Sequence, residues 1–107
     1  MPVLLPHQAH AAAEKLADRL SADNRGRLKV LIDTLGGDGR GTVGEVQKAL
    51  WPGASTPMAN KALDRLIKAI NDAATKASAS LAVAIDGDKK LGPARKLWFE
   101  EIGRAHV

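Results

Sequence analysis

The sequence predicts a mainly helical α+β domain that ends in a β-hairpin. Apolar residues recur with helical spacing as far as Ala77, and strict alternation replaces that spacing a few residues later. Glycine and proline residues separate the periodic segments. The chain has 107 residues, and 45% of them are hydrophobic, which suits one core. We therefore expect a single domain over residues 1–107.

The first predicted helix covers residues 7–20. Pro6 can stand at its start, where the missing N–H costs little. Its apolar stripe consists of Ala9, Ala12, Ala13, Leu16 and Leu20. We expect this helix either to pack on the core or to pair with its counterpart in a homodimer.

A second helix is predicted to follow, with Ser21 or Asp23 as its N-cap. Its apolar stripe consists of Leu28, Leu31, Ile32 and Leu35. The pair Gly36-Gly37 is typical of a left-handed C-cap and predicts the end of the helix. The glycine-rich loop that follows lacks the Lys-Ser/Thr ending of a phosphate-binding loop, so we expect it to be a connector.

Residues 43–70 predict two helices joined by a tight turn. Thr42 and Glu45 have the spacing of a capping box, and Trp51-Pro52-Gly53 predicts the end of the first helix. The inward residues of that helix are predicted to be Val43, Val46, Ala49 and Leu50. The short segment Gly41-Thr42-Val43 suits either a minimal strand or the N-cap alone.

The longest predicted helix begins at Ser55 or Thr56, with Pro57 in its first turn. Its apolar stripe consists of Ala59, Ala62, Leu63, Leu66, Ile67 and Ile70, continued by three alanines. The opposite face is polar and mainly charged. We expect about six turns, longer than an average globular helix.

Residues 80–101 predict a β-hairpin. Leu81, Val83 and Ile85 alternate with smaller residues, whereas Leu97 and Phe99 face away from Trp98. A lone hairpin is marginal in water, so we expect its apolar face to cover the stripe of the long helix. The segment Thr42-Val43 can add a third, edge strand.

The order of helix, turn, longer helix and hairpin is the winged helix-turn-helix plan, here with an extra N-terminal helix. The run VGEVQKALWPGASTPMANKALDRLIKAI resembles bacterial winged-helix transcription regulators of the response-regulator and antibiotic-regulator type. In those proteins a Leu-Trp-Pro helix end, here Leu50-Trp51-Pro52, precedes a turn and a recognition helix. The resemblance implies a DNA-binding module, either a small transcriptional regulator or part of one, with the recognition helix at residues 55–70.

The charge of the chain favours an anionic partner. Sixteen Lys and Arg residues stand against 12 Asp and Glu residues, a net charge of +4. In a winged helix the recognition helix enters the major groove and a basic wing follows the phosphates. We therefore expect double-stranded DNA as the partner. The candidate contacts are Ser55, Thr56, Asn60, Lys61, Arg65, Lys68, Lys89, Lys90, Arg95 and Lys96.

Each group of candidates also has a structural interpretation. The polar helix face suits a solvated surface on which Asp64 and Lys68 pair. The basic wing suits a soluble loop that discourages edge pairing. As the alternative function, the same fold suits an adaptor or assembly module in a larger bacterial system. Such a module would bury an apolar patch that includes Trp98 and the N-terminal helix. Trp51 is expected to pack mainly in the core.

Catalytic and metal sites are not expected. The chain has no cysteine, and His7 and His10 share a helical face without a third ligand near them. No nucleophile and base can be paired, so we expect no enzyme, no cofactor and no metal. A signal peptide and a membrane span are not predicted, and the lack of cysteine suits a reducing compartment, so we expect a cytoplasmic protein.

Overall fold

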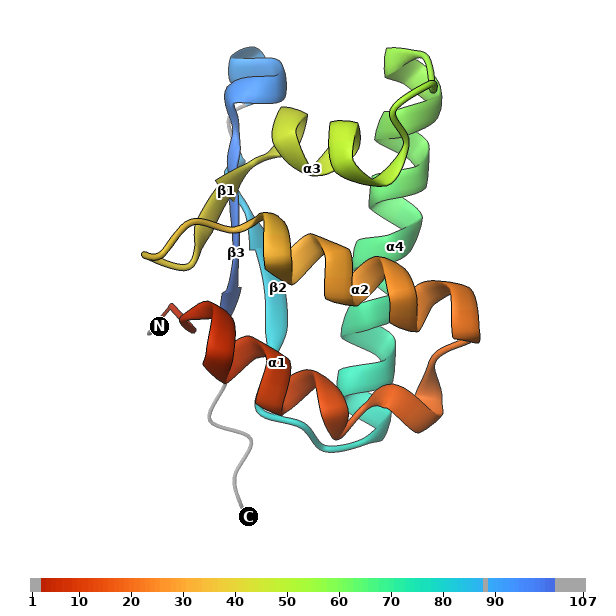
Figure 1. The fold of residues 1–107 in the computed structure, drawn as a ribbon, viewed down its shortest axis with the longest axis vertical. Coiled ribbons are helices and arrows are strands. Elements are labelled where there is room, and N and C mark those ends of the chain that lie inside the picture. Colours follow the sequence, from red (N-terminus) through yellow and green to blue (C-terminus); the bar gives the residue numbers. More distant parts are fainter. Residues whose placement is uncertain (1–2, 88, 102–107) are drawn as a thin grey trace.

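The computed structural model describes residues 3–87 and 89–101 (Figure 1). Over these residues the chain is mainly helical with a small sheet, which confirms the α+β prediction. The helices are α1 (Pro6–Glu14), α2 (Ala22–Thr34), α3 (Val43–Leu50) and α4 (Thr56–Lys76). The strands are β1 (Arg40–Thr42), β2 (Ala82–Ile85) and β3 (Lys96–Glu100). Two 3₁₀ segments, η1 (Ala17–Arg19) and η2 (Lys89–Ala94), complete the order.

The sheet is antiparallel, with the strand order β1-β3-β2. Val83 stands opposite Phe99 in the predicted hairpin, and Gly41 stands opposite Leu97. The predicted edge strand is therefore present, slightly earlier in the chain than expected. Leu4 continues the pairing along the edge of β3 that β1 occupies, because the N–H of Leu4 donates to the carbonyl of Phe99 at 2.8 Å.

Hydroxyl side chains cap three helices, as the sequence predicts. The hydroxyls of Ser21, Thr42 and Ser55 accept the N–H groups of Asn24 (3.2 Å), Glu45 (3.2 Å) and Met58 (3.5 Å). Each bond satisfies one of the free backbone donors in the first turn of a helix. The observed helix starts therefore follow from local chemistry.

The first helix is shorter than the prediction of residues 7–20. It ends at Glu14, and the chain continues as η1. The guanidinium of Arg25, on α2, donates to the carbonyls of Ala17 (3.3 Å) and Leu20 (3.0 Å). A side chain from the next helix thus satisfies the carbonyls of this segment. The spacing of apolar residues gives no sign of that contact.

Two details of the predicted helix ends and faces are wrong. Helix α2 ends at Thr34, its C-cap Leu35 is extended, and the left-handed glycine of the following turn is Gly39 (φ 84°). The N–H of Gly36 donates to the carbonyl of Arg40 at 2.8 Å, so Gly36 belongs to the turn into β1. Ala49 is exposed, because the buried stripe of α3 passes through Val43 and Val46.

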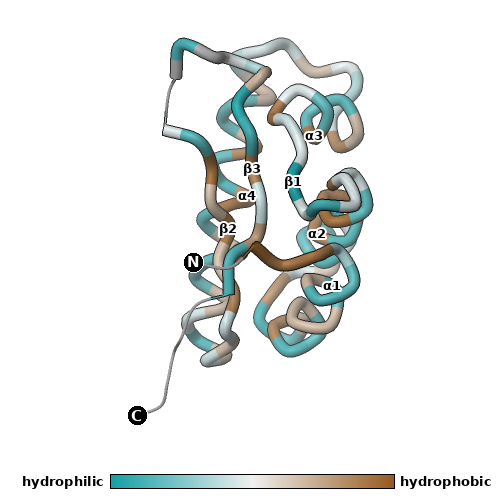
Figure 2. Tube along the Cα trace, turned by 90° about the vertical axis from the view of Figure 1, so that its left-hand side faces the viewer, coloured by the Kyte–Doolittle hydropathy of each residue, from teal (hydrophilic) through white to brown (hydrophobic). Residues whose placement is uncertain are grey.

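The core lies between the helices and one face of the sheet. Leu63 and Ile70 of α4 pack with Leu97 and Phe99 of β3, and each is at most 2% exposed. Ala9 of α1 is fully buried in the same cluster, so α1 packs on the core. Figure 2 shows the other face of the sheet, which none of the described elements covers. Among the described residues, every helix is too short or too polar to cross a lipid bilayer.

Candidate functional site

Helix α4 carries the predicted contact residues on two different faces. Successive residues of an α-helix are rotated by about 100°. Thr56 and Asn60 therefore lie about a third of a turn from the face that carries Lys61, Arg65 and Lys68. All five side chains are exposed. The structure thus divides what the sequence presented as one recognition surface.

The first face of α4 borders a groove of about 590 Å³ between α3, α4 and the loop from β2 to β3. Thr56, Asn60 and Arg95 line it, so it joins three of the predicted residues. The side-chain oxygen of Asn60 accepts from Nε2 of Gln47 at 2.7 Å, which ties α4 to α3. Asn60 is consequently engaged within the fold.

Two carboxylates line the same groove. Asp64 extends the face of Asn60, and Asp86 enters from the loop after β2. Arg95 faces them as a half-buried cation, and its Nε atom is buried without a hydrogen-bond partner. The groove therefore has mixed charge, and its carboxylates would repel the phosphates of a DNA backbone.

The predicted wing folds back on the helices. Segment η2 contacts the start of α3, where a Cβ on Gly44 would lie 3.0 Å from Cβ of Pro93. The carbonyl of Arg95 accepts the N–H of Val43 at 2.8 Å. Of the predicted wing cations, Lys90 and Lys96 are exposed, and the side chain of Lys89 lies outside the described part of the structure.

A second candidate surface surrounds Trp51, which the sequence assigned mainly to the core. Trp51 is only half-buried and borders two hollows. One hollow, of about 250 Å³, is lined by Asn24, Arg27, Trp51, Ala62, Arg65 and Leu66. The other, of about 240 Å³, is lined by Gly44, Gln47, Lys48, Trp51, Pro52, Ala54, Thr56 and Ala59.

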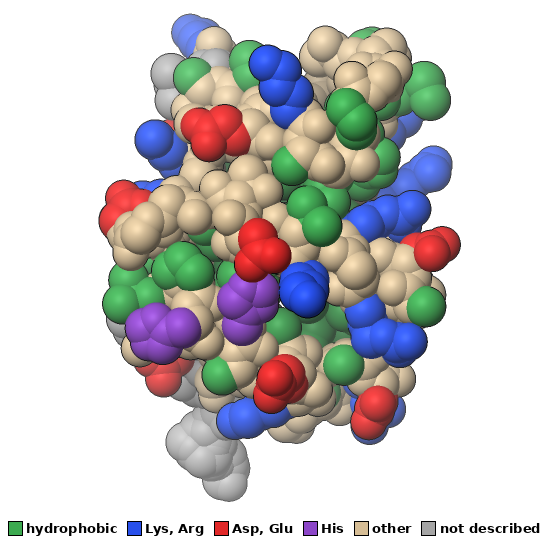
Figure 3. Space-filling model, viewed as in Figure 1, with side chains coloured by type: hydrophobic (Ala, Val, Ile, Leu, Met, Phe, Trp, Pro, Cys, Tyr) green, Lys and Arg blue, Asp and Glu red, His purple; other side chains and the backbone are tan. Residues whose placement is uncertain are grey.

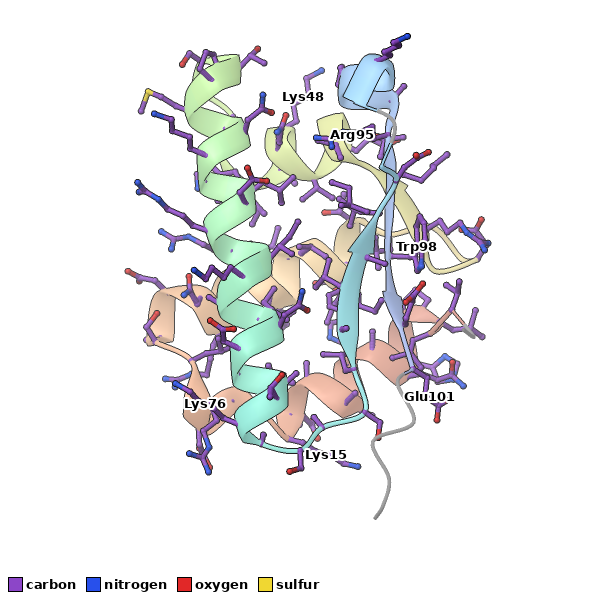
Figure 4. All side chains as sticks on the ribbon, turned by 180° about the vertical axis from the view of Figure 1, so that it is seen from behind. Lys15, Lys48, Lys76, Arg95, Trp98 and Glu101 are labelled. Atoms are coloured by element: carbon purple, nitrogen blue, oxygen red, sulfur yellow. The ribbon has the colours of Figure 1, made fainter. Side chains whose placement is uncertain are left out.

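Arg27 and Lys48 are the surface cations that sequence reasoning missed. Both are exposed, and they come from α2 and α3. Figure 3 shows cationic side chains along the edge where α2 and α4 meet, and Figure 4 shows Lys48 beside the groove that holds Arg95. Lys48 lies three residues before Trp51 in the same helical turn, so helical spacing could have found it. Arg27 gave no local signal besides its charge, because the packing of α2 against α3 and α4 brings it to Trp51.

The outer face of the sheet presents the other tryptophan. Trp98 is half-buried, and its Nε1–H donates to a carboxylate oxygen of Glu100 at 3.0 Å. The guanidinium carbon of Arg40 lies 5.8 Å from the ring centroid, within cation–π range. The sequence left the role of Trp98 open. Because Leu97 and Phe99 on either side of it are buried in the core, Trp98 lies on the opposite side of the sheet, away from α4 (Figure 4).

His10 has a structural partner. Its Nε2 atom lies 2.8 Å from a carboxylate oxygen of Asp33, which joins α1 to α2. Within residues 3–87 and 89–101, no three His, Asp or Glu side chains are grouped closely enough to hold a metal ion.

Comparison with known proteins adds one match. No curated protein and no solved structure shows significant similarity to the chain. The sequence model of the family NACHT N-terminal Helical domain 6 (NNH6) matches residues 5–102.

This match corrects the resemblance to bacterial winged-helix transcription regulators, which is wrong. Three expectations that rested on this resemblance lose their support. They are DNA-binding transcription regulation, a bacterial source and double-stranded DNA as the partner. The match covers nearly all of the 107 residues and includes every helix and strand described above. The chain therefore belongs to the NNH6 family of NACHT N-terminal helical domains.

Proposed function

We propose that this domain is a protein-interaction or assembly module of a larger, NACHT-containing signalling protein. The family match over residues 5–102 is the observation that carries the proposal, because its description names a domain N-terminal to a NACHT module. The alternative function that the sequence suggested, an adaptor or assembly module, is thus the better supported one. DNA is no longer the partner to consider.

The surface supports a protein partner. Met58, at the start of α4, is 65% exposed, and Trp51 is half-buried. Trp98 lies on the side of the sheet away from α4 (Figure 4). Tryptophan and arginine are enriched at the energetic centres of protein interfaces. Trp51 has Arg27 and Arg65 near it and Trp98 has Arg40, so the domain has two surfaces of the right composition.

The winged-helix architecture is part of the proposal. The order of α2, β1, α3, α4, β2 and β3 and the strand order β1-β3-β2 support it. We infer that the fold serves protein contact, with α1 as an addition on the core. NMR contacts between Gly41 and Leu97 would support this topology, and contacts between β1 and β2 instead would overturn it.

The remaining parts of the proposal follow from composition. We propose that the domain binds its partner without catalysing a reaction. We also propose a cytoplasmic location, because a chain without cysteine suits a reducing compartment. Self-association through α1 would have to use its outer side, because Ala9 is already buried in the core. Light scattering of the purified domain would show the dimer if that surface pairs.

The native protein provides the test. An antibody against this domain should detect a gene product far above 11.3 kDa in its cell of origin, since a NACHT module adds its own mass. Removing residues 5–102 from that product should abolish its assembly with partner proteins and leave nucleotide binding intact. A native product of the size of the domain alone would overturn the proposal, and so would assembly that persists after the deletion.

A further inference from the structure

We infer that the Trp51 corner is a docking site for an acidic protein segment that carries large apolar side chains. The Trp51 corner comprises Arg27, Lys48, Trp51, Pro52 and Arg65, which line the two hollows around Trp51. It also includes Met58, which lies one helical turn before Ala62, a lining residue of the first hollow, on α4. The inference rests on the proposed function and names the partner chemistry of one surface.

The unbalanced charge of this corner indicates the charge of its partner. Arg27 and Arg65 come from α2 and α4 and line the same hollow of about 250 Å³. Within the described residues, neither guanidinium makes an ion pair, and Arg27 only donates to Asn24 at 3.1 Å. Two like charges beside one small hollow repel each other, and a carboxylate between them would relieve that repulsion.

The apolar part of the corner indicates the rest of the partner. Trp51 separates the hollow that holds both arginines from the hollow beside Pro52, so it forms a ridge between them. Met58, at the start of α4, is the most exposed large hydrophobic residue among those described. An apolar centre with a cationic rim is complementary to an amphipathic segment with Asp or Glu beside Leu or Phe.

This composition favours a protein segment over nucleic acid. A nucleic-acid backbone supplies phosphates to the arginines but no aliphatic side chain for the ridge at Trp51. In addition, the neighbouring face of α4 carries Asp64, which would lie near a long polyanion and repel it. A short acidic segment can reach Arg27 and Arg65 without meeting that carboxylate.

The test uses the whole chain in a Trp98→Phe background, so that Trp51 is the one tryptophan that reports. The probe is a short blocked peptide of Glu-Glu-Leu-Leu repeats, and its comparator has Gln in place of Glu. We expect a saturable change in Trp51 emission with the acidic peptide. Reversing the rim with Arg27→Glu and Arg65→Glu should raise the Kd at least about tenfold.

The matched control reverses two exposed cations, Lys15→Glu and Lys76→Glu, at the end of the molecule opposite Lys48 (Figure 4), with the same change of net charge. It should change the Kd by less than about twofold, because exposed charges are screened over such distances. Met58→Ser, at a side chain too exposed to disturb folding, should weaken binding by about threefold. Circular dichroism verifies that each variant is folded.

Several outcomes would overturn the inference. They are equal binding of the Gln peptide, no binding of the acidic peptide, and an unchanged Kd in the Arg27→Glu, Arg65→Glu variant. Tighter, arginine-dependent binding of a random DNA duplex would overturn it in favour of a nucleic acid. If the native product is nevertheless large and its assembly requires this domain, the proposed function stands and only the assignment of this surface fails.

Discussion

Asn71 of α4 pairs its side-chain amide with both backbone polar groups of Val83 in β2. The N–H of Val83 donates to Oδ1 of Asn71 at 2.8 Å, and Nδ2 of Asn71 donates to the carbonyl of Val83 at 3.5 Å. β2 is an edge strand, and an unpaired edge invites pairing with another chain. Asn71 therefore both fixes α4 on the sheet and protects this edge.

Replacing Asn71 should accordingly reduce stability. Asn71→Ala leaves the part-buried N–H and carbonyl of Val83 without their partner, which costs about 1–3 kcal/mol of unfolding free energy. Asn71→Asp keeps the acceptor for the stronger bond and should lose less. Urea denaturation measures both, with Asp72→Ala at an exposed neighbouring position as the control. Equal stability of Asn71→Ala and Asp72→Ala would show that the amide contributes nothing.

Gly39 should be the least replaceable glycine of the turn before β1. Its φ of 84° disfavours any side chain, and a Cβ there would lie 2.3 Å from the carbonyl oxygen of Leu4. Gly39→Ala should therefore lower the unfolding free energy by about 2 kcal/mol or more. Gly37→Ala meets nothing within 4 Å and should be nearly neutral. Comparable melting temperatures for the two variants would contradict this account.

Ser55 was predicted both as a DNA contact and as a possible N-cap of the long helix, and in the structure it is the N-cap of α4. Ser55→Ala should cost about 1 kcal/mol of stability, and Ser55→Asp should retain it, because a carboxylate also accepts the N–H of Met58. Thermal denaturation provides the comparison, with Ser80→Ala, at an exposed residue outside the helices, as a reference. A stable Ser55→Ala protein would mean that the cap is dispensable.

The contact between His10 and Asp33 should contribute little. The two side chains are 37% and 58% exposed, and exposed pairs are weak and screened by salt. Asp33→Asn should lower the unfolding free energy by less than about 1 kcal/mol at low ionic strength. The difference should shrink further when salt is added. A large loss that persists at high salt would point to a role for Asp33 beyond this contact.

Much of the fold could be predicted because its signals are local. The alternation of Leu97 and Phe99 against Trp98 matches the observed burial of the first two and the outer position of the third. The helix ends were less predictable. Arg25 supports the segment after α1 from another helix, and Gly39 takes the left-handed conformation expected at Gly36 or Gly37.

The candidate sites depended more on packing than on pattern. Helical spacing correctly grouped Lys61 with Arg65, but only the fold placed Arg65 beside Arg27 and Trp51. Likewise, Arg95 joined the groove of Asn60 rather than a separate wing. The basic pattern on α4 predicted a DNA-binding regulator, and the family match overturned that interpretation.

By itself, the sequence determined where helices begin, which stripes are apolar and where the period changes from helix to strand. Those features depend on hydrogen bonds and side-chain spacing within a few residues. Only the tertiary structure decided which exposed side chains share a surface, because the angles between packed helices depend on the whole core. That is why Ser55 could be identified as a cap from its neighbours in the sequence. The position of Arg27 and Arg65 beside the same hollow could not be identified in that way.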